Sequence, residues 1–137
     1  MQVEMKRIQP QVNGLSSEFF DGCNQGLLKL QSCLNCHAVQ FYPRVLCAVC
    51  SERDMVWINA SGRGNVASFT IVRRALTEGY EAPYVVALID LKEGPRMMSN
   101  IVGCSPEIVV VGAAVKVAFT AWSDTLSLPV FELDNEK

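Results

Sequence analysis

The sequence predicts a mainly β protein in which a short N-terminal helix and a small metal-binding ribbon precede a closed five-stranded barrel. Three observations predict this architecture. Four cysteines form two closely spaced pairs in the first half of the chain, and short apolar stretches alternate with glycine and proline turns in the second half. Half of the 137 residues are hydrophobic and only 19% are charged, which supplies a packed core and excludes a chain that is disordered throughout.

The first 26 residues are expected to form a loose arm and a short helix. Residues 1–13 are mostly polar, whereas residues 15–21, with the sequence LSSEFFD, are suited to one or two helical turns anchored by Phe19 and Phe20. We treat it as a hypothesis that the arm becomes ordered only on a partner. Protection of the arm from proteolysis in a complex, but not in the free chain, would support that hypothesis.

Residues 27–53 are predicted to form a zinc ribbon. Ten residues separate Cys33-x-x-Cys36 from Cys47-x-x-Cys50. Each pair can lie on a tight turn that presents two thiolates to one ion, and four thiolates complete the tetrahedral shell of a structural Zn²⁺. Three alternatives stay open: iron, because thiolates bind both metals; a redox dithiol; and two disulfides, which a reducing compartment disfavours.

Two short strands, at residues 27–31 and 41–44, are predicted to lead into the two cysteine turns. The ribbon is too small to fold by its core alone, so an apparent zinc-binding energy of roughly 10–16 kcal/mol would be its folding energy. His37 is the only histidine and is expected beside the site or at the surface, because four thiolates already fill the ligand shell. Cys23 and Cys104 lack partners at ligand spacing and are expected to be inert core residues.

Residues 54–137 are predicted to form the barrel. Its first strand is long, and the glycines of residues 61–64 interrupt it, which is typical of a β-bulge that bends a strand. A short helix is expected at residues 105–111, between the third and fourth strands. Five short strands must avoid open edges, and a Greek-key barrel of the OB type does so. The five strands are expected at residues 55–72, 84–91, 96–102, 114–121 and 129–133, the second and third forming a hairpin.

These motifs, taken in order, resemble the rubredoxin-like zinc-ribbon plus OB-fold family, which was long filed as a domain of unknown function. The resemblance covers roughly residues 15–133. Two departures are Phe41, where relatives often carry a second proline, and His37, where a glycine is common; neither removes a cysteine. Besides the cysteine pairs, the matching motifs are Tyr42-Pro43-Arg44, Ser61-Gly62-Arg63-Gly64, Tyr84-Val85-Val86-Ala87-Leu88, Glu93-Gly94 and Leu128-Pro129-Val130-Phe131.

The resemblance implies an accessory subunit that is not catalytic by itself. Members of the family accompany thiolase-like, lipid-transfer-protein-like or hydratase-like enzymes that act on acyl-CoA thioesters. They resemble subunits that dock on the enzyme and help to bind or shield the CoA end of the substrate. We therefore expect a hetero-oligomer with a thiolase-fold or lipid-transfer-protein-like enzyme subunit, and acyl-CoA as the candidate ligand.

Six side chains are candidates for contacting CoA. The guanidinium fork of an arginine suits phosphates, and a tyrosine ring can stack on adenine. For the arginines the alternative is a surface ion pair, and for the tyrosines it is packing within the loop. Trp57 and Trp122 are either interface anchors or core residues. The six candidates are Arg44 in the ribbon, Arg63 in the glycine turn, Arg73 and Arg74 at the end of the first barrel strand, and Tyr80 and Tyr84 on either side of Pro83.

The charge balance weighs against competing functions. Twelve basic and 14 acidic residues give a net charge of -2 and a pI of about 5.4, whereas a dedicated nucleic-acid binder is usually basic, with a pI above about 9. A single-stranded nucleic-acid-binding OB-fold protein is therefore the alternative function, and a scaffold with no small-molecule site is a third. No apolar run approaches the roughly 20 residues that span a bilayer, and the N-terminus lacks the apolar centre of a signal peptide. We expect a soluble cytoplasmic protein with no membrane partner.

Overall fold

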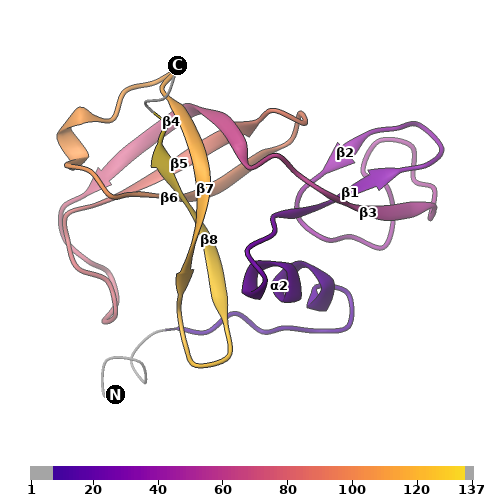
Figure 1. Ribbon diagram of the computed structural model, residues 1–137, viewed down its shortest axis with the longest axis horizontal. Helices are drawn as coiled ribbons and strands as arrows, with labels where there is room; N and C mark the ends of the chain where they lie inside the picture. The colour runs from indigo at the N-terminus through magenta and orange to yellow at the C-terminus, as the bar shows by residue number, and fades with distance from the viewer. Residues whose placement is uncertain (1–7, 135–137) are drawn as a thin grey trace.

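The computed structural model describes residues 8–134, in which a short helix, a three-stranded sheet and a closed barrel follow one another along the chain (Figure 1). The predicted mainly β fold is confirmed. Helix α2 covers Ser17–Asn24, so it begins and ends slightly later than expected. Residues 1–7 of the predicted arm lie outside the described residues, and residues 8–13 are neither helix nor strand. Within residues 8–134 no helix is long and apolar enough to cross a membrane.

The ribbon sheet has the strand order β2-β1-β3 and consists of β1 (Lys29–Cys33), β2 (Val39–Gln40) and β3 (Met55–Asn59). The prediction of a strand at residues 41–44 is wrong, because the return strand is β2 and it ends before the Tyr-Pro sequence. Strand β3 was expected to begin the barrel, but it pairs antiparallel with β1 along its whole length. The predicted segment boundaries at residues 26 and 53 stay predictions.

The barrel closes with the strand order β4-β5-β6-β8-β7. All neighbours are antiparallel except β6 and β8, which run parallel. This order, in which the fifth barrel strand lies between the third and the fourth, is that of the predicted OB fold. The strands are β4 (Arg63–Val72), β5 (Tyr84–Leu91), β6 (Arg96–Val102), β7 (Ala114–Ala121) and β8 (Ser127–Leu133).

Two glycines stand where the chain passes from the ribbon into the barrel. Gly62 has φ +80°, a left-handed conformation that favours glycine. At Gly64 an added Cβ would lie 2.5 Å from the carbonyl oxygen of Asp90 on the neighbouring strand. The predicted bulge at these glycines is wrong, because the shift of register lies between Val66 and Ser68. The glycines instead allow the close approach of neighbouring strands.

The connection between β6 and β7 contains much less helix than expected. Only one 3₁₀ turn, η1 (Pro106–Ile108), forms in place of the predicted helix at residues 105–111. The four residues from 108 to 111 are all β-branched, and such side chains lose rotamer freedom in a helix. The chain therefore becomes extended after the proline turn, and Val109 enters the core.

The helix joins the ribbon and the barrel through one continuous core. Phe19 and Phe20 of α2 belong to the same buried cluster as Leu30 of the ribbon and Phe131 of the barrel. In the barrel, β5 alternates partly buried and fully buried side chains from Tyr84 to Leu91, as expected of a strand with one face in a core. Figure 1 shows α2 below the junction of the two sheets, beside the turn that connects β7 to β8.

Candidate functional site

The four paired cysteines come together at one end of the ribbon. The Sγ atoms of Cys33 and Cys50 are 3.6 Å apart, as are those of Cys36 and Cys47. All four sulfur atoms lie within 4.8 Å of one another. Tetrahedral thiolates at about 2.3 Å from a zinc ion would be separated by about 3.8 Å. The observed cluster therefore has the donor set and the size that a four-thiolate metal site requires.

Both cysteine turns have the same backbone geometry. The amide of His37 donates to the carbonyl of Cys33 at 2.9 Å, and the amide of Ser51 donates to the carbonyl of Cys47 at 3.0 Å. His37 and Ser51 have φ values of 66° and 68°. This left-handed conformation is one that glycine adopts more readily than other residues. His37 is thus part of the turn, next to the thiols.

Hydrogen bonds to sulfur favour the thiolate form in the second turn. The backbone amides of Cys50 and Val49 lower the pKa of the Cys47 thiol to about 6. The pKa of the Cys50 thiol is also lowered, first by the side-chain amide of Asn35, whose Nδ2 lies 3.5 Å from Sγ. Donors that favour a thiolate also favour the metal-binding form of cysteine.

The two remaining cysteines lie away from this cluster. Cys23 is buried in the core beside the ribbon, and desolvation raises the pKa of its thiol to about 12. Cys104 is partly buried, and desolvation also raises its pKa. Both thiols are therefore protonated at neutral pH, which agrees with the inert role expected of them.

A second feature is an open groove of about 750 Å³ between the barrel, α2 and the ribbon. Residues from β6 and β8 line the groove, together with aromatic rings from other segments. The rings of Tyr80 and Tyr84 stack with centroids 5.1 Å apart, and Trp122 lies 5.4 Å from Tyr80. The indole Nε1 of Trp122 donates to the carbonyl of Ile8 at 2.8 Å, which holds the N-terminal segment against the groove. The ring residues are Phe19, Phe20, Phe41, Tyr42, Tyr80, Tyr84 and Trp122.

The groove contains little charge. Among the residues that the structure describes, neither lysine nor arginine lines it, and Glu81 is the one acidic residue that does. Of the six predicted CoA contacts, Tyr80 and Tyr84 line the groove and the four arginines do not. Sequence reasoning missed the groove because its lining comes from segments that are far apart in the chain.

The four arginines are dispersed over the surface. Arg63, at the start of β4, forms an ion pair with Asp134, which follows β8. Arg73 forms an ion pair with Glu107, with Nη2 2.9 Å from Oε2. Arg44 and Arg74 are exposed. The structure therefore does not bring these arginines together into one phosphate site, and their contact with CoA stays a prediction.

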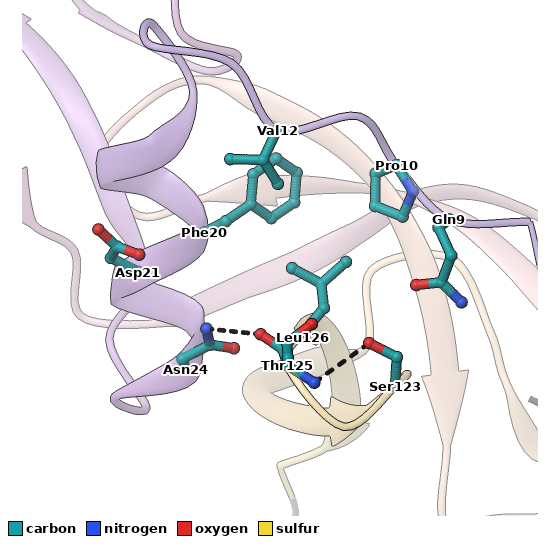
Figure 2. A pocket seen from close by; sticks show the side chains of 9 residues that line it. All are labelled: Gln9, Pro10, Val12, Phe20, Asp21, Asn24, Ser123, Thr125 and Leu126. Carbon is teal, nitrogen blue, oxygen red and sulfur yellow. Dashed lines mark hydrogen bonds between the residues drawn. The ribbon is translucent and has the colours of Figure 1, made fainter.

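A smaller cavity of about 510 Å³ lies on the other side of the N-terminal segment (Figure 2). Asn24, the last residue of α2, points into the β7–β8 turn. Its Nδ2 donates to the carbonyl of Thr125 at 3.1 Å, and its Oδ1 accepts from the amide of Ser127 at 2.8 Å. This amide clamp ties the helix to the barrel and so fixes one wall of the groove.

Comparison with known proteins identifies the family. One family model, described as the ChsH2 rubredoxin-like zinc ribbon domain, matches residues 20–56, and another, the ChsH2 C-terminal OB-fold domain, matches residues 57–120. A solved structure described as an Ltp2-ChsH2(DUF35) aldolase contains a chain with 31% identity and a TM-score of 0.84, and the match covers 91% of this chain and 98% of that one. The chain belongs to the ChsH2-type DUF35 family.

Two curated relatives of this DUF35 chain carry descriptions of different kinds. A probable enoyl-CoA hydratase alpha subunit of Thermomonospora curvata is 32% identical over 125 residues, which are 91% of this chain and 39% of that protein. A DUF35 domain-containing scaffold protein of Methanocaldococcus jannaschii is 38% identical over 89 residues, which are 64% of this chain and 63% of the relative. The DUF35 chain thus spans less than two thirds of either relative.

Proposed function

We propose that this chain is a non-catalytic accessory subunit that docks on a thiolase-like acyl-CoA-processing enzyme of the cytoplasm and helps to shield the CoA thioester. Its four paired cysteines would hold one structural Zn²⁺, which makes the ribbon a fixed part of the assembly. The descriptions of its relatives support this role, since one is a scaffold protein, one is a hydratase subunit and one belongs to an Ltp2-ChsH2 aldolase.

The observation that carries the proposal is the apolar, ring-lined groove, which has no basic side chain among the described residues that line it. Such a groove suits an uncharged, elongated group, because apolar walls and a few polar atoms bind apolar chains. The pantetheine and acyl parts of an acyl-CoA have this chemistry, whereas its phosphates do not. Tyr80 and Tyr84 would contact this uncharged part. Of the four arginines, Arg44 is best placed for a phosphate that leaves the groove, since it follows Tyr42 of the groove wall by two residues and is exposed.

The same observation weighs against the nucleic-acid alternative. A protein that binds single strands combines stacked rings with a basic groove that follows the phosphates. Here Tyr80 and Tyr84 are stacked and Trp122 lies beside them, but the part of the groove that the structure describes has no lysine or arginine in its lining.

The tips of the cysteine turns offer a surface for docking. Leu34 and Val49, one in each turn, are 60% and 73% exposed, and Val45 and Leu46 beside them are also exposed. We call these four residues the knuckle surface. Contiguous exposed apolar side chains are typical of protein–protein contacts. We infer that the enzyme subunit covers the knuckle surface.

Affinity isolation of the tagged chain from its native cells tests the proposed function. We expect an acyl-CoA-processing enzyme subunit to co-purify with the wild-type chain. Val49→Lys should weaken this association, because it places a charge in the apolar contact. The matched control is Val111→Lys, which changes an exposed valine on the connection before β7, at the other end of the molecule (Figure 1). Isolation of the chain alone, or with nucleic acid that salt releases, would contradict the proposal.

A second experiment tests the groove. Trp122 lies beside Tyr80, so its fluorescence should change when an acyl-pantetheine or acyl-CoA enters the groove. Tyr80→Ala should weaken binding of the ligand by the isolated complex, whereas Leu76→Ala should not, since Leu76 is exposed and does not line the groove. Equal effects of the two substitutions would argue against ligand binding at the groove.

A further inference from the structure

Two buried glutamines lie side by side in the ribbon sheet, and neither the family assignment nor the proposed function gives them a role. Gln31 in β1 and Gln40 in β2 are directly opposite each other in the ribbon sheet. Their exposed fractions are 4% and 7%. A buried amide destabilises a fold unless its donors and acceptors are hydrogen-bonded. The partners of these two amides therefore show what the glutamines stabilise.

Gln40 holds the backbone on both sides of Cys47. Its Nε2 donates to the carbonyl of Leu46 at 3.3 Å, and its Oε1 accepts from the amide of Ala48 at 2.9 Å. The side chain of Gln40 thus pairs with the main chain as a neighbouring strand would. Cys47, which lies between these two contacts, is fixed relative to β2.

Gln31 supports Gln40 and the start of the same loop. Its Oε1 accepts from Nε2 of Gln40 at 2.9 Å and from the amide of Arg44 at 2.9 Å. Its Nε2 donates to the carbonyl of Arg44 at 3.0 Å. Residues 41–46 are neither helix nor strand, so these side-chain amides take the place of a missing strand.

The two glutamines connect the first cysteine pair to the second. In β1, Gln31 precedes the ligand Cys33 by two residues and therefore lies on the same face of the strand. From that face the side-chain amides of Gln31 and Gln40 form hydrogen bonds to the loop that carries Cys47. The position of the second cysteine turn relative to the first thus depends on buried hydrogen bonds as well as on an ion.

We propose that Gln31 and Gln40 form a glutamine brace that holds Cys47 in ligand position before the metal binds. This inference rests on the proposed metal site and adds the residues that set its affinity. Ordering a loop costs conformational entropy, so a loop that is already ordered leaves more of the binding free energy for the ion. Gln40 contacts both neighbours of Cys47 and acts directly, whereas Gln31 acts through Gln40 and Arg44.

Metal titration of the full chain tests the glutamine brace. Co²⁺ is added to metal-free wild-type, Gln40→Met, Gln31→Met and Gln25→Met chains, and the thiolate-to-cobalt absorption is followed. Loss of a partner that orients a metal ligand typically weakens binding by about 10–100-fold. We expect a loss of that size for Gln40→Met and a smaller loss for Gln31→Met. Gln25→Met is the matched control, because Gln25 is exposed beyond the end of α2, and it should bind as the wild type does.

Two further measurements separate a positioning role from a general loss of structure. When it is saturated with Co²⁺, the Gln40→Met chain should show the same four-thiolate spectrum as the wild type. The unfolding midpoint of its barrel should not change. Equal affinities of all four chains would overturn the brace. An affinity loss accompanied by an unfolded barrel in both Gln40→Met and Gln31→Met would overturn it as well. A wild-type chain that binds no metal would instead refute the proposed site itself.

Discussion

Replacing Gly64 by alanine tests how the barrel closes. An added Cβ would lie 2.5 Å from the carbonyl oxygen of Asp90 and 2.9 Å from Cγ2 of Ile89, whereas ordinary contacts begin at 3.4 Å. Strands β4 and β5 would have to separate locally by 0.9 Å, the difference between 3.4 and 2.5 Å. The carbonyl is part of the β4–β5 ladder and cannot rotate away as a side chain could. Overpacking of this kind costs about 1–3 kcal/mol.

Thermal and guanidinium unfolding followed by circular dichroism measure this cost. For a chain of this size a loss of 1–3 kcal/mol corresponds to a fall in Tm of about 3–12 °C. The control is Gly14→Ala, because an added Cβ there meets no atom within 4 Å. Alanine at such a site leaves stability unchanged or raises it slightly, by about 0.4–1 kcal/mol, since it restricts the unfolded chain. If the Gly64→Ala and Gly14→Ala chains unfold at the same temperature and the same guanidinium concentration, the close approach of β4 and β5 does not constrain the fold.

Three further predictions concern the helix, a buried thiol and the metal. Asn24→Ala should destabilise the chain by about 0.5–1.5 kcal/mol, because its hydrogen bonds to the β7–β8 turn are lost while water can reach their exposed partners; an unchanged free energy of unfolding in guanidinium would contradict the clamp. Cys23 should resist alkylation at pH 8 until the chain unfolds, since burial raises the pKa of its thiol from an ordinary value of 9.0 to about 12. This raised pKa stabilises the fold below pH 9, and the contribution is lost as the pH rises toward 12; rapid labelling of the native chain would show that the thiol is not buried. Chelation should raise hydrogen exchange more in β1 than in β5, because β1 ends at the proposed ligand Cys33, whereas the buried side chains of β5 lie in the core away from the cysteine cluster; equal exchange in both strands would show that they unfold as one unit.

The features that sequence predicted best are those fixed by local chemistry. The spacing of Cys33, Cys36, Cys47 and Cys50 brings four thiols together because each pair needs only a tight turn. The hairpin of residues 84–102 follows from an apolar stretch and a returning strand on either side of a glycine–proline turn, and it is present as β5 and β6.

The features that sequence missed depend on contacts between distant segments. Strand β3 is a short apolar run that looks like a barrel strand, so its pairing with β1 instead of the barrel has no local signal. The groove joins the N-terminal segment, α2, a loop of the ribbon and three parts of the barrel. A weak signal existed for the brace, since Gln31 and Gln40 are amides inside or beside apolar stretches that flank a cysteine pair.

The metal content of the purified chain tests the central claim most directly. Elemental analysis should give one zinc per polypeptide, and X-ray absorption should show four sulfur ligands at about 2.3 Å from the ion. Such a shell would establish that the ribbon beside the groove is held together by the four paired cysteines. A purified chain that contains no metal, that contains iron in place of zinc, or whose zinc has nitrogen or oxygen ligands would contradict this structural account.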